Sequence, residues 1–524
     1  MDSDVAQASA ESELKISDLI LASVSGCLLI FAFPNFSWSF IAWLALVPLL
    51  VAIYRSSFKG ALLCGLTAGV FFFGGLLYWI FLFGLLAGFG LILSQSFFFL
   101  LFGLGTKVIH SHFKREARLI LVPALWVSLE FLRSIGPWGF SWGVLGYSQY
   151  NFLPIIQIAK WTGVLGVSFL LVFVNEFIAE NYTHIFQQKG SAIQRIILWI
   201  KGSGRIFLRD TVLVLLGVIL LVGIGNLNLS GSRGSGETIK IAILQPSIPQ
   251  DIKWEPMKKE EVFEAHLKLA REAAEEKPYI IIWPETSTPA YLLEEEEYFK
   301  KIKDLAEKAD SFLLVGGLYR PAGRHGENKG RSFNSAFLFS PKGEILDRYD
   351  KLHLVPFGEY VPLKPIFSNI EAVASASGDT SPGKEFTVFE TGAGRFSAVI
   401  CFESSDSLIV RRLALKGAEM LVVMTNDGWF KKTAAAEQHL SMAVLRAVEN
   451  DFFVVQAANT GISAIINSRG RVVSRTALFD RKCLAGKIVL REGKSFYRRF
   501  GDIFSYSCLL ISLGSIFFAF NLKK

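Results

Sequence analysis

The sequence predicts a multi-span α-helical membrane region joined to an α/β domain. Three observations support this fold class. Hydrophobic residues make up 51% of the 524-residue chain and charged residues only 19%, which is unlike a soluble enzyme. Several uncharged runs approach the roughly 20 residues that cross a bilayer as a helix. Between the last two of these runs, short apolar segments alternate with amphipathic ones, as in an α/β domain.

The membrane region is expected to contain about eight transmembrane helices. The candidate runs are Leu19–Phe33, Phe40–Tyr54, Ala61–Leu82, Leu86–Gly105, Leu119–Leu132, Phe152–Phe177, Val212–Leu229 and Ile503–Leu522. The first, second and fifth runs are short, so a tilted or interfacial placement stays open for them. Tryptophans cluster at run ends, where headgroup-level anchors are found.

Positive charge predicts the orientation of the chain. With eight spans, one set of loops and tails collects 14 basic residues, against seven on the other side outside the large domain. Because cytoplasmic loops are enriched in Lys and Arg, both termini are expected in the cytoplasm and the large domain outside it. That domain holds 33 basic and 34 acidic residues, so the excess positive charge belongs to the membrane region. Nucleic-acid binding is therefore not supported.

Composition shifts divide the chain into four parts. Residues 1–229 form an N-terminal membrane domain with seven candidate helices, and residues 230–236 form a Gly/Ser linker. Residues 237–490 form the extracytoplasmic α/β domain, and residues 491–524 hold the last helix and a cytoplasmic tail. Several strand-like runs of the α/β domain are joined by turns alone, which favours a mixed sheet or two stacked sheets.

Three residues at strand ends are candidates for chemistry. Glu285, Lys351 and Cys401 each follow a different strand-like segment. Each has an ordinary alternative: Glu285 could cap a helix, Lys351 could be a surface lysine, and Cys401 could be an inert core residue. Together they form a coherent set, because a thiol nucleophile needs a base and a nearby cation. The glutamate would take the thiol proton, and the lysine would stabilise the oxyanion of a tetrahedral intermediate.

The motifs around these residues resemble the carbon–nitrogen hydrolase (nitrilase-like) superfamily. The matching stretches are Trp283-Pro284-Glu285, the run from Tyr349 to Pro362, Ile400-Cys401-Phe402-Glu403, the run from Thr425 to Phe430, and the run from Ala458 to Ser463. The spans before and after this domain, with Glu130–Arg133 and Gly146–Gln149, are similar to one branch, the apolipoprotein N-acyltransferases. The resemblance implies an αββα sandwich in which glutamate, lysine and cysteine act in that chain order.

The resemblance also implies roles for individual residues. Cys401 would be the nucleophile, Glu285 the general base and Lys351 the oxyanion-stabilising cation. Supporting roles fall to Glu359, which would orient the lysine, and to three further residues: Glu403, Trp254 and Asn334. Two positions depart from the family pattern. Phe402 stands where relatives often have Tyr, and Lys431 stands where Gly is common.

The implied reaction is N-acylation of the N-terminal diacylglyceryl-cysteine of apolipoproteins. A phospholipid, usually phosphatidylethanolamine, would give its acyl chain to Cys401 as a thioester before transfer to the amine. The resemblance implies a monomer of the bacterial inner membrane that faces the periplasm, and no cofactor or metal is expected. Pro362–Ile370, Glu371–Gly378 and Trp429–Phe430 are expected either to dip into the membrane as arms or lids or to pack as ordinary surface loops.

Three alternatives stay open. A membrane-tethered amidase would pass through the same acyl-enzyme with water as acceptor, since the residue set does not separate hydrolysis from transfer. A transporter or receptor would require functional charges inside the spans, for which Glu130 and Glu176 are candidates. A disulfide between Cys401 and Cys483 is conceivable in an oxidising compartment, whereas the acyltransferase interpretation requires Cys401 to be free.

Overall fold

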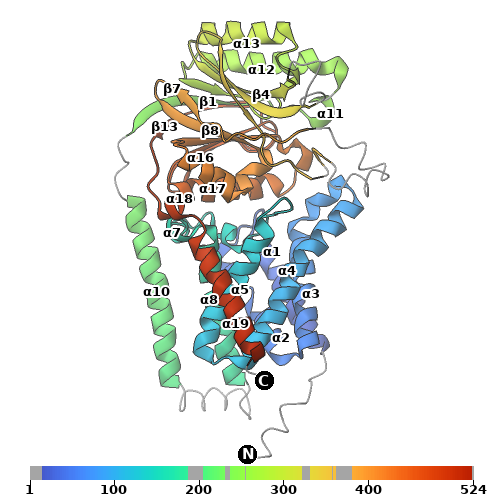
Figure 1. Ribbon diagram of the computed structural model, residues 1–524, viewed down its shortest axis with the longest axis vertical. Helices are drawn as coiled ribbons and strands as arrows, with labels where there is room; N and C mark the ends of the chain where they lie inside the picture. The colour runs from blue at the N-terminus through green and yellow to red at the C-terminus, as the bar shows by residue number, and fades with distance from the viewer. Residues whose placement is uncertain are drawn as a thin grey trace, which may run out of the picture. The chain divides into compact units, whose positions relative to one another are not determined.

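The structure is a computed structural model that describes residues 15–186, 204–230, 236–253, 255–321, 331–356, 358–360 and 380–521 (Figure 1). The chain forms two compact units. The first comprises Met1–Ile135, Gly139–Ser230 and Asp502–Lys524, and the second comprises Gly136–Trp138 and Gly231–Gly501.

The first unit is built from helices. They are α1 (Ile16–Ala32), η2 (Ser39–Trp43), α2 (Val47–Arg55), α3 (Phe58–Leu76), η3 (Tyr78–Phe83), α4 (Leu85–His112), α5 (Arg115–Ser134), η4 (Leu145–Gln149), α6 (Leu153–Ile156), α7 (Ala159–Thr162), α8 (Val164–Phe186), α10 (Gly204–Ser230) and α19 (Ile503–Asn521). Large apolar side chains on α10 and α19 are exposed, as expected of surfaces that face lipid.

Five helices of the described residues are long and apolar enough to cross a membrane. They are Phe58–Leu76, Leu85–His112, Val164–His184, Leu208–Ser230 and Ile503–Asn521. These correspond to the third, fourth, sixth, seventh and eighth predicted runs. The three short runs form α1, η2 with α2, and α5. These helices are shorter or carry more charged residues than the five helices above. The multi-span helical region is thus confirmed.

Besides the run Phe40–Tyr54, which is divided into η2 and α2, two predicted runs are interrupted in the structure. The run Ala61–Leu82 ends its α-helix at Leu76 and continues as η3. The run Phe152–Phe177 is divided into α6, α7 and α8, and Gly163 between α7 and α8 has a φ of 69°. A left-handed residue of this kind ends a helix, and glycine adopts it without a steric penalty. Uncharged sequence alone does not mark such breaks.

Three charged residues inside the first unit, Glu130, Arg133 and Glu176, have partners there. Glu130 lies 3.9 Å from Arg133 and accepts a hydrogen bond of 2.7 Å from the backbone N–H of Leu145. Glu176 accepts a hydrogen bond from the hydroxyl of Tyr54. All three charged side chains are buried. These contacts hold helices together, as buried charges in membrane domains require partners.

The second unit contains two β-sheets. Its strands are β1 (Glu237–Gln245), β2 (Ile280–Ile282), β3 (Thr288–Tyr291), β4 (Phe312–Tyr319), β5 (Phe333–Phe339), β6 (Ile345–Asp350), β7 (Phe389–Thr391), β8 (Gly394–Ile400), β9 (Met420–Thr425), β10 (Phe453–Ala458), β11 (Ala464–Ile466), β12 (Val472–Arg475) and β13 (Lys482–Leu490). One sheet has the order β13-β1-β2-β4-β5-β6, with β3 paired to β4, and the other has the order β12-β11-β10-β9-β8-β7.

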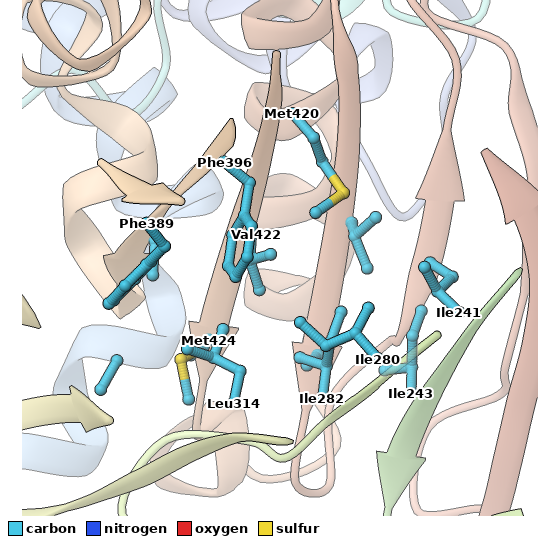
Figure 2. Close-up of a cluster of buried hydrophobic side chains, with 14 of the residues drawn as sticks. Ile241, Ile243, Ile280, Ile282, Leu314, Phe389, Phe396, Met420, Val422 and Met424 are labelled. Carbon is cyan, nitrogen blue, oxygen red and sulfur yellow. The ribbon is translucent and has the colours of Figure 1, made fainter. Parts of the chain in front are cut away.

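The core of this unit lies between the two sheets (Figure 2). Successive side chains of a strand point to opposite faces. On β1, Ile241 and Ile243 therefore join the core between the sheets, where β9 contributes Met420, Val422 and Met424. Each fully buried side chain of this size contributes about 1.5–3 kcal/mol.

Helices cover the outer face of each sheet (Figure 1). Helices α12 (Lys259–Ala274) and α13 (Glu296–Ala309) pack on the first sheet, where Ala242 and Leu244 of β1 belong to the same buried cluster as Phe263 and Leu305. Helices α16 (Ser407–Leu415) and α17 (Ala435–Asn450) lie against the second sheet. The shorter helical segments are α11 (Gln250–Lys253), η5 (Pro256–Lys258), η6 (Cys401–Ser405), η7 (Asp427–Phe430) and α18 (Phe496–Phe500). The predicted αββα sandwich is confirmed.

Candidate active site

The strand directions bring the candidate residues to one edge of each sheet. In the first sheet β2 and β4 are parallel. Strand β5 is antiparallel to its neighbours β4 and β6, so β6 runs in the same direction as β2 and β4. Glu285 follows β2 and Lys351 follows β6, and Asn334 begins the antiparallel β5 at the same edge. In the second sheet β8 and β9 are parallel, and Cys401 and Asn426 follow them.

Glu285 is held at the end of β2 by a close turn. Ser287 donates hydrogen bonds of 2.9 Å from its hydroxyl to the carbonyls of Pro284 and Gly316. Gly316 has no space for a side chain, because a Cβ there would clash with the Pro284 carbonyl oxygen. Thr286 has a positive φ of 44°. This backbone turn directs the buried Glu285 carboxylate toward the edge of the sheet.

Two carboxylates and an amide surround the Lys351 ammonium. Its Nζ lies 2.9 Å from Oε1 and 2.8 Å from Oε2 of Glu359, and 3.9 Å from Oε1 of Glu285. Asn334 Nδ2 donates to Glu285 Oε1 at 2.8 Å and to Glu359 Oε1 at 3.2 Å. Glu285 Oε2 accepts a bond of 2.9 Å from the backbone N–H of Asn426.

Electrostatics keep Lys351 charged although only 1% of it is exposed. Burial alone would lower its pKa, but the carboxylates of Glu359 and Glu285 outweigh burial and raise the pKa above its usual value. Both carboxylates face the same ammonium, so Lys351 also suppresses their mutual repulsion. The cluster therefore places one fixed cation beside the Glu285 carboxylate. The other donors to this carboxylate, the Asn334 amide and the Asn426 backbone N–H, are neutral.

Cys401 occupies a strained position at the first residue of η6. Its φ of 56° lies in the left-handed region, which non-glycine residues rarely adopt and which is often found at functional sites. Burial raises the pKa of the thiol above its usual range, and the Glu285 carboxylate raises it further, while the Lys351 ammonium lowers it. The resting group is therefore a thiol on which the charge of the Glu285 carboxylate acts, an arrangement in which proton transfer to Glu285 would create the nucleophile.

A buried histidine fixes the backbone around Cys401. His439 Nε2 lies 3.1 Å from the Cys401 carbonyl oxygen and 2.6 Å from the Ser404 hydroxyl. Its Nδ1 lies 3.1 Å from Asp427 Oδ1, which also accepts a bond of 2.9 Å from the Thr425 hydroxyl. The side chains of His439, Ser404, Asp427 and Thr425 are buried. They link the strained turn of η6 to the end of β9 and to α17.

The Glu403 carboxylate joins the lysine loop to the cysteine turn. Its Oε1 accepts bonds from the Tyr349 hydroxyl at 2.8 Å and from the backbone N–H groups of Leu352 at 2.7 Å and His353 at 3.0 Å. Its Oε2 accepts from the Ile400 N–H at 2.7 Å. All four partners donate, so the group acts as a carboxylate and holds the residues that flank Lys351 and Cys401 at a fixed separation.

Glu403→Gln is expected to lower the free energy of unfolding of the second unit by about 3 kcal/mol. The glutamine side chain places an N–H₂ group against donors, which leaves buried N–H groups unsatisfied. Denaturant unfolding followed by near-ultraviolet circular dichroism measures the change. Glu344→Gln is the control, because Glu344 lies exposed in a turn, and it should change stability by less than about 0.5 kcal/mol. Equal stability of the two variants would contradict the bridging role.

The two departures from the family pattern have different structural settings. The Phe402 ring packs edge-on against His353, with ring centroids 5.7 Å apart. Lys431 follows η7 with φ 51° and ψ −150°, a conformation found almost entirely for glycine. The lysine therefore strains the loop at the position where glycine is common in the family that the sequence resembles.

Lys431→Gly is expected to raise the free energy of unfolding by about 1 kcal/mol, because the substitution removes this backbone strain. Thermal unfolding of the purified protein measures the effect. Lys432→Gly serves as the control, since Lys432 is also exposed but does not have a positive φ. It should lose roughly 0.5–1 kcal/mol through chain entropy, besides its contact with the Phe479 ring. A loss of stability in both variants would show that the conformation at Lys431 carries no strain.

The structure brings together most of the predicted site residues. Asn334, Glu359 and Glu403 lie in the hydrogen-bond network around Glu285, Lys351 and Cys401. Trp254 lies outside the described residues, as do Pro362–Ile370 and Glu371–Gly378. Trp429 is described and is half exposed.

Several residues of the site were not predicted. Asn426, Asp427 and His439 support it by hydrogen bonds, and Lys253 donates to the main chain of Glu285. Asn426 and Asp427 directly follow the buried strand β9, a signal that could have identified them. Lys253 and His439 lie within helices, where no pattern in the sequence singles them out.

All five cysteines are free thiols, so Cys401 is not bonded to Cys483. Within the described residues, no group of three or more His, Cys, Asp or Glu side chains could hold a metal ion.

Comparison with known proteins identifies relatives of both units. A family model described as carbon-nitrogen hydrolase matches residues 240–496, and one described as apolipoprotein N-acyltransferase N-terminal domain matches residues 25–177. The chain is 37% identical over 502 residues to an apolipoprotein N-acyltransferase of Geobacter metallireducens, covering 94% of this chain and 93% of that one. It is 30% identical over 523 residues to one of Thermotoga maritima, covering 95% and 93%. A solved amidase from Nesterenkonia sp. is 18% identical, with a TM-score of 0.38, and the match covers 52% of this chain and 96% of the amidase.

Proposed function

Because the chain belongs to the apolipoprotein N-acyltransferase family, we propose that it acylates the α-amino group of the N-terminal diacylglyceryl-cysteine of apolipoproteins. It is a bacterial membrane protein and an acyltransferase of lipoprotein maturation. The observation that carries the assignment of its chemistry is the arrangement of Glu285, Lys351 and Cys401 after the ends of β2, β6 and β8, with the Lys351 ammonium 3.9 Å from the Glu285 carboxylate and the cysteine in a strained turn. The acyl donor is a phospholipid, with phosphatidylethanolamine as the expected one.

The first half-reaction forms a thioester on Cys401. Glu285 takes the proton of the thiol, and the sulfur attacks the ester carbonyl of the phospholipid. The Lys351 ammonium stabilises the negative charge on the carbonyl oxygen of the tetrahedral intermediate. The intermediate then expels the glycerol oxygen, which receives the proton from Glu285 and leaves as the hydroxyl group of a lysophospholipid.

The second half-reaction transfers the chain to the amine. The free α-amino group of the diacylated lipoprotein attacks the thioester carbonyl, and Lys351 again stabilises the oxyanion. Glu285 accepts a proton from the attacking nitrogen, and the departing sulfur regains a proton as the thiol. An amide forms and a thioester breaks, so the enzyme returns to its starting state without an oxidant or a cofactor.

The supporting residues hold the catalytic side chains in position and balance the charge of Lys351. Glu359 holds the Lys351 ammonium, and Asn334 bridges Glu359 to Glu285. Glu403 fixes the segment of Lys351 relative to Cys401. Trp254, four residues beyond the start of α11, is assigned to this group because of the resemblance of its motif to that of the family.

A membrane location suits both substrates. Moving an acyl chain from lipid into water costs about 0.8 kcal/mol for each CH₂, so a site at the bilayer surface lets the chains remain in lipid. The chain is divided as 1–229, 230–236, 237–490 and 491–524, with both termini in the cytoplasm and the catalytic domain in the periplasm. The excess of basic residues in one set of loops supports this orientation. The enzyme works as a monomer, since one chain contains all the proposed catalytic groups.

A two-step labelling experiment tests the function. Purified enzyme is incubated with phosphatidylethanolamine labelled in its acyl chain, and a hydroxylamine-sensitive adduct is expected on the Cys401 peptide. Addition of a diacylated lipopeptide should then discharge the label into a triacylated product. Release of the label only as free fatty acid would instead assign the chain to amidase-type hydrolysis with water as acceptor, and the absence of any adduct would reject the thioester.

A further inference from the structure

The short helix that precedes the last membrane helix has an exposed face that is both aromatic and basic. Helix α18 spans Phe496–Phe500 and belongs to the second unit. Phe496, Arg499 and Phe500 are exposed, whereas Tyr497 and Arg498 are buried. Residues three and four positions apart share one face of a helix. The rings of Phe496 and Phe500 pack with their centroids 4.4 Å apart, and the Arg499 guanidinium lies 5.3 Å from the centroid of the Phe500 ring.

The length of the chain brings this helix to the level of the lipid headgroups. Helix α19 begins at Ile503 and has 19 residues, which corresponds to about 28 Å. The hydrocarbon core of a bilayer is about 30 Å thick, so Ile503 lies near its boundary when α19 crosses the membrane. Phe500 precedes Ile503 by three residues, which span at most about 11 Å. The exposed face of α18 is therefore within reach of the headgroups, which occupy roughly the next 5–8 Å.

An arginine of α16 fixes the C-terminal end of α18 to the second unit. Arg411 Nε donates to the carbonyl oxygens of Tyr497 at 3.1 Å and Arg498 at 2.9 Å, and its Nη2 donates to that of Arg499 at 3.0 Å. The next residue after the helix, Gly501, has a φ of 66°, and a Cβ there would lie 2.7 Å from the Arg411 guanidinium carbon. Glycine thus permits both the turn that ends the helix and the close approach of this arginine.

Helix α18 is also joined to the helices beside the proposed nucleophile (Figure 1). Ser495, which precedes α18, accepts a bond of 3.0 Å from the backbone N–H of Arg498 and donates to the carbonyl of Glu449 on α17. Arg498 donates to the carbonyl of Ala414 on α16. Helix α16 begins just after η6, the turn that carries Cys401. The exposed face of α18 is therefore part of the same rigid packing as the active site.

The basic residues before α19 divide into two pairs. Arg491 and Arg498 form ion pairs within the second unit, with N–O distances of 2.5 Å and 3.6 Å. Lys494 and Arg499 are exposed, and among the described residues no carboxylate lies within 4.0 Å of either charged group. A guanidinium presents paired N–H donors that match the oxygens of a phosphate. Aromatic side chains beside such a cation are typical of surfaces that lie at a membrane interface.

We propose that α18 is an interfacial anchor of the second unit, in which Phe496 and Phe500 enter the boundary of the bilayer and Arg499 binds the phosphate of a phospholipid headgroup. Lys494 adds positive charge to the same segment, which favours anionic phospholipids. The inference rests on α19 as a membrane helix and is independent of the acyl-transfer chemistry. It gives the α/β unit an attachment to lipid of its own, beyond the helices that cross the membrane.

Photocrosslinking in a bilayer tests this anchor. The photoreactive residue p-benzoylphenylalanine is introduced in place of Phe500 in the full-length protein, which is placed in nanodiscs of phosphatidylethanolamine and phosphatidylglycerol and irradiated. Mass spectrometry of the labelled peptide then identifies the molecule to which the residue has bonded. Leu293 is the matched control position, because it is 46% exposed against 45% for Phe500. It lies in the turn before α13, on the outer face of the first sheet and thus at the far side of the sandwich.

Position 500 should give at least about tenfold more phospholipid adduct than position 293, because an interfacial side chain is in steady contact with lipid. Equal yields at the two positions would overturn the proposal. So would a residue at position 500 that bonds to protein in place of lipid. The readout needs no thioester, so a failure here is distinct from a failure of the proposed acyl transfer.

A second comparison tests the role of the charge. In the protein labelled at position 500, Arg499→Gln should lower the yield of phospholipid adduct by about fivefold, the factor that corresponds to one charge near a membrane surface. Arg271→Gln is the matched control and should leave the yield unchanged, since Arg271 is exposed on α12 at the far side of the sandwich. Equal yields in the two variants would reject phosphate binding by Arg499.

Discussion

Cys401→Ala is expected to abolish the thioester and to lower acyl transfer by at least about 10⁴-fold, the scale of loss when a covalent nucleophile is removed. The expectation follows from the position of the sulfur. Cys401 alone among the cysteines is acted on by the charges of both Glu285 and Lys351, and its left-handed backbone is fixed by the contact of its carbonyl oxygen with His439. The neighbouring Ser404 is no substitute, because its hydroxyl is fully buried against His439.

The measurement combines two readouts on the same preparation. Labelled phosphatidylethanolamine reports the thioester, and mass spectrometry of a lipopeptide acceptor reports the triacylated product. Cys483→Ala is the matched control, since Cys483 lies on β13 at the far side of β1 and is also a free thiol. It should retain full activity. Transfer that survives in Cys401→Ala but is lost in Cys483→Ala would place the nucleophile elsewhere.

The positions of Glu285, Lys351 and Cys401 could be predicted because simple patterns determine them. Glu285 and Cys401 are polar or reactive residues that follow buried apolar strands, Lys351 follows the strand-like segment that ends at Asp350, and parallel strands end at a common edge. The turns between the strand-like runs allowed either a mixed sheet or two stacked sheets, and the resemblance to the nitrilase-like superfamily indicated the sandwich of two sheets. Glu285 and Lys351 are 66 positions apart in sequence, yet the directions of β2 and β6 place them 3.9 Å apart.

The supporting contacts could not be predicted, because they depend on tertiary register. Glu403 binds N–H groups of residues about fifty positions away, and no local pattern encodes that pairing. Lys253 lies in a helix of four residues, too short to show a periodicity. The left-handed conformation of Cys401 also leaves no signal in the sequence, since it is imposed by hydrogen bonds from other segments rather than by a glycine.

In the membrane helices, too, the sequence predicts less than the structure shows. Uncharged runs identified where helices occur, but the breaks at Leu77 and Gly163 lie inside those runs. Apolar residues are compatible with both a continuous and an interrupted helix in lipid. The close approach of α3 and α4 depends likewise on a single residue, Gly65, where a side chain would collide with the backbone of Phe99 on α4.

Glu285→Gln should slow thioester formation by about 10³-fold, within the range that general acid–base catalysis contributes. The variant has nearly the same shape, but an amide cannot take the proton of the thiol. Both carboxylate oxygens accept hydrogen bonds, from Asn334 and from the backbone N–H of Asn426. The amide nitrogen would oppose one of these donors, so a modest loss of stability of about 1 kcal/mol is also expected.

The alkylation rate of Cys401 reports how readily its thiol ionises. Measured in Glu285→Gln, it distinguishes the loss of a catalytic base from a general loss of structure. The Glu285 carboxylate raises the pKa of the Cys401 thiol, so removing its negative charge lowers that pKa. Iodoacetamide should therefore alkylate Cys401 faster near neutral pH in Glu285→Gln, although the same variant accepts an acyl chain far more slowly. Glu390→Gln, an exposed carboxylate on β7, is the matched control and should change neither rate. A variant in which alkylation and acylation slow together would show that Glu285 only maintains the fold, whereas opposite changes in the two rates identify it as the group that takes the proton.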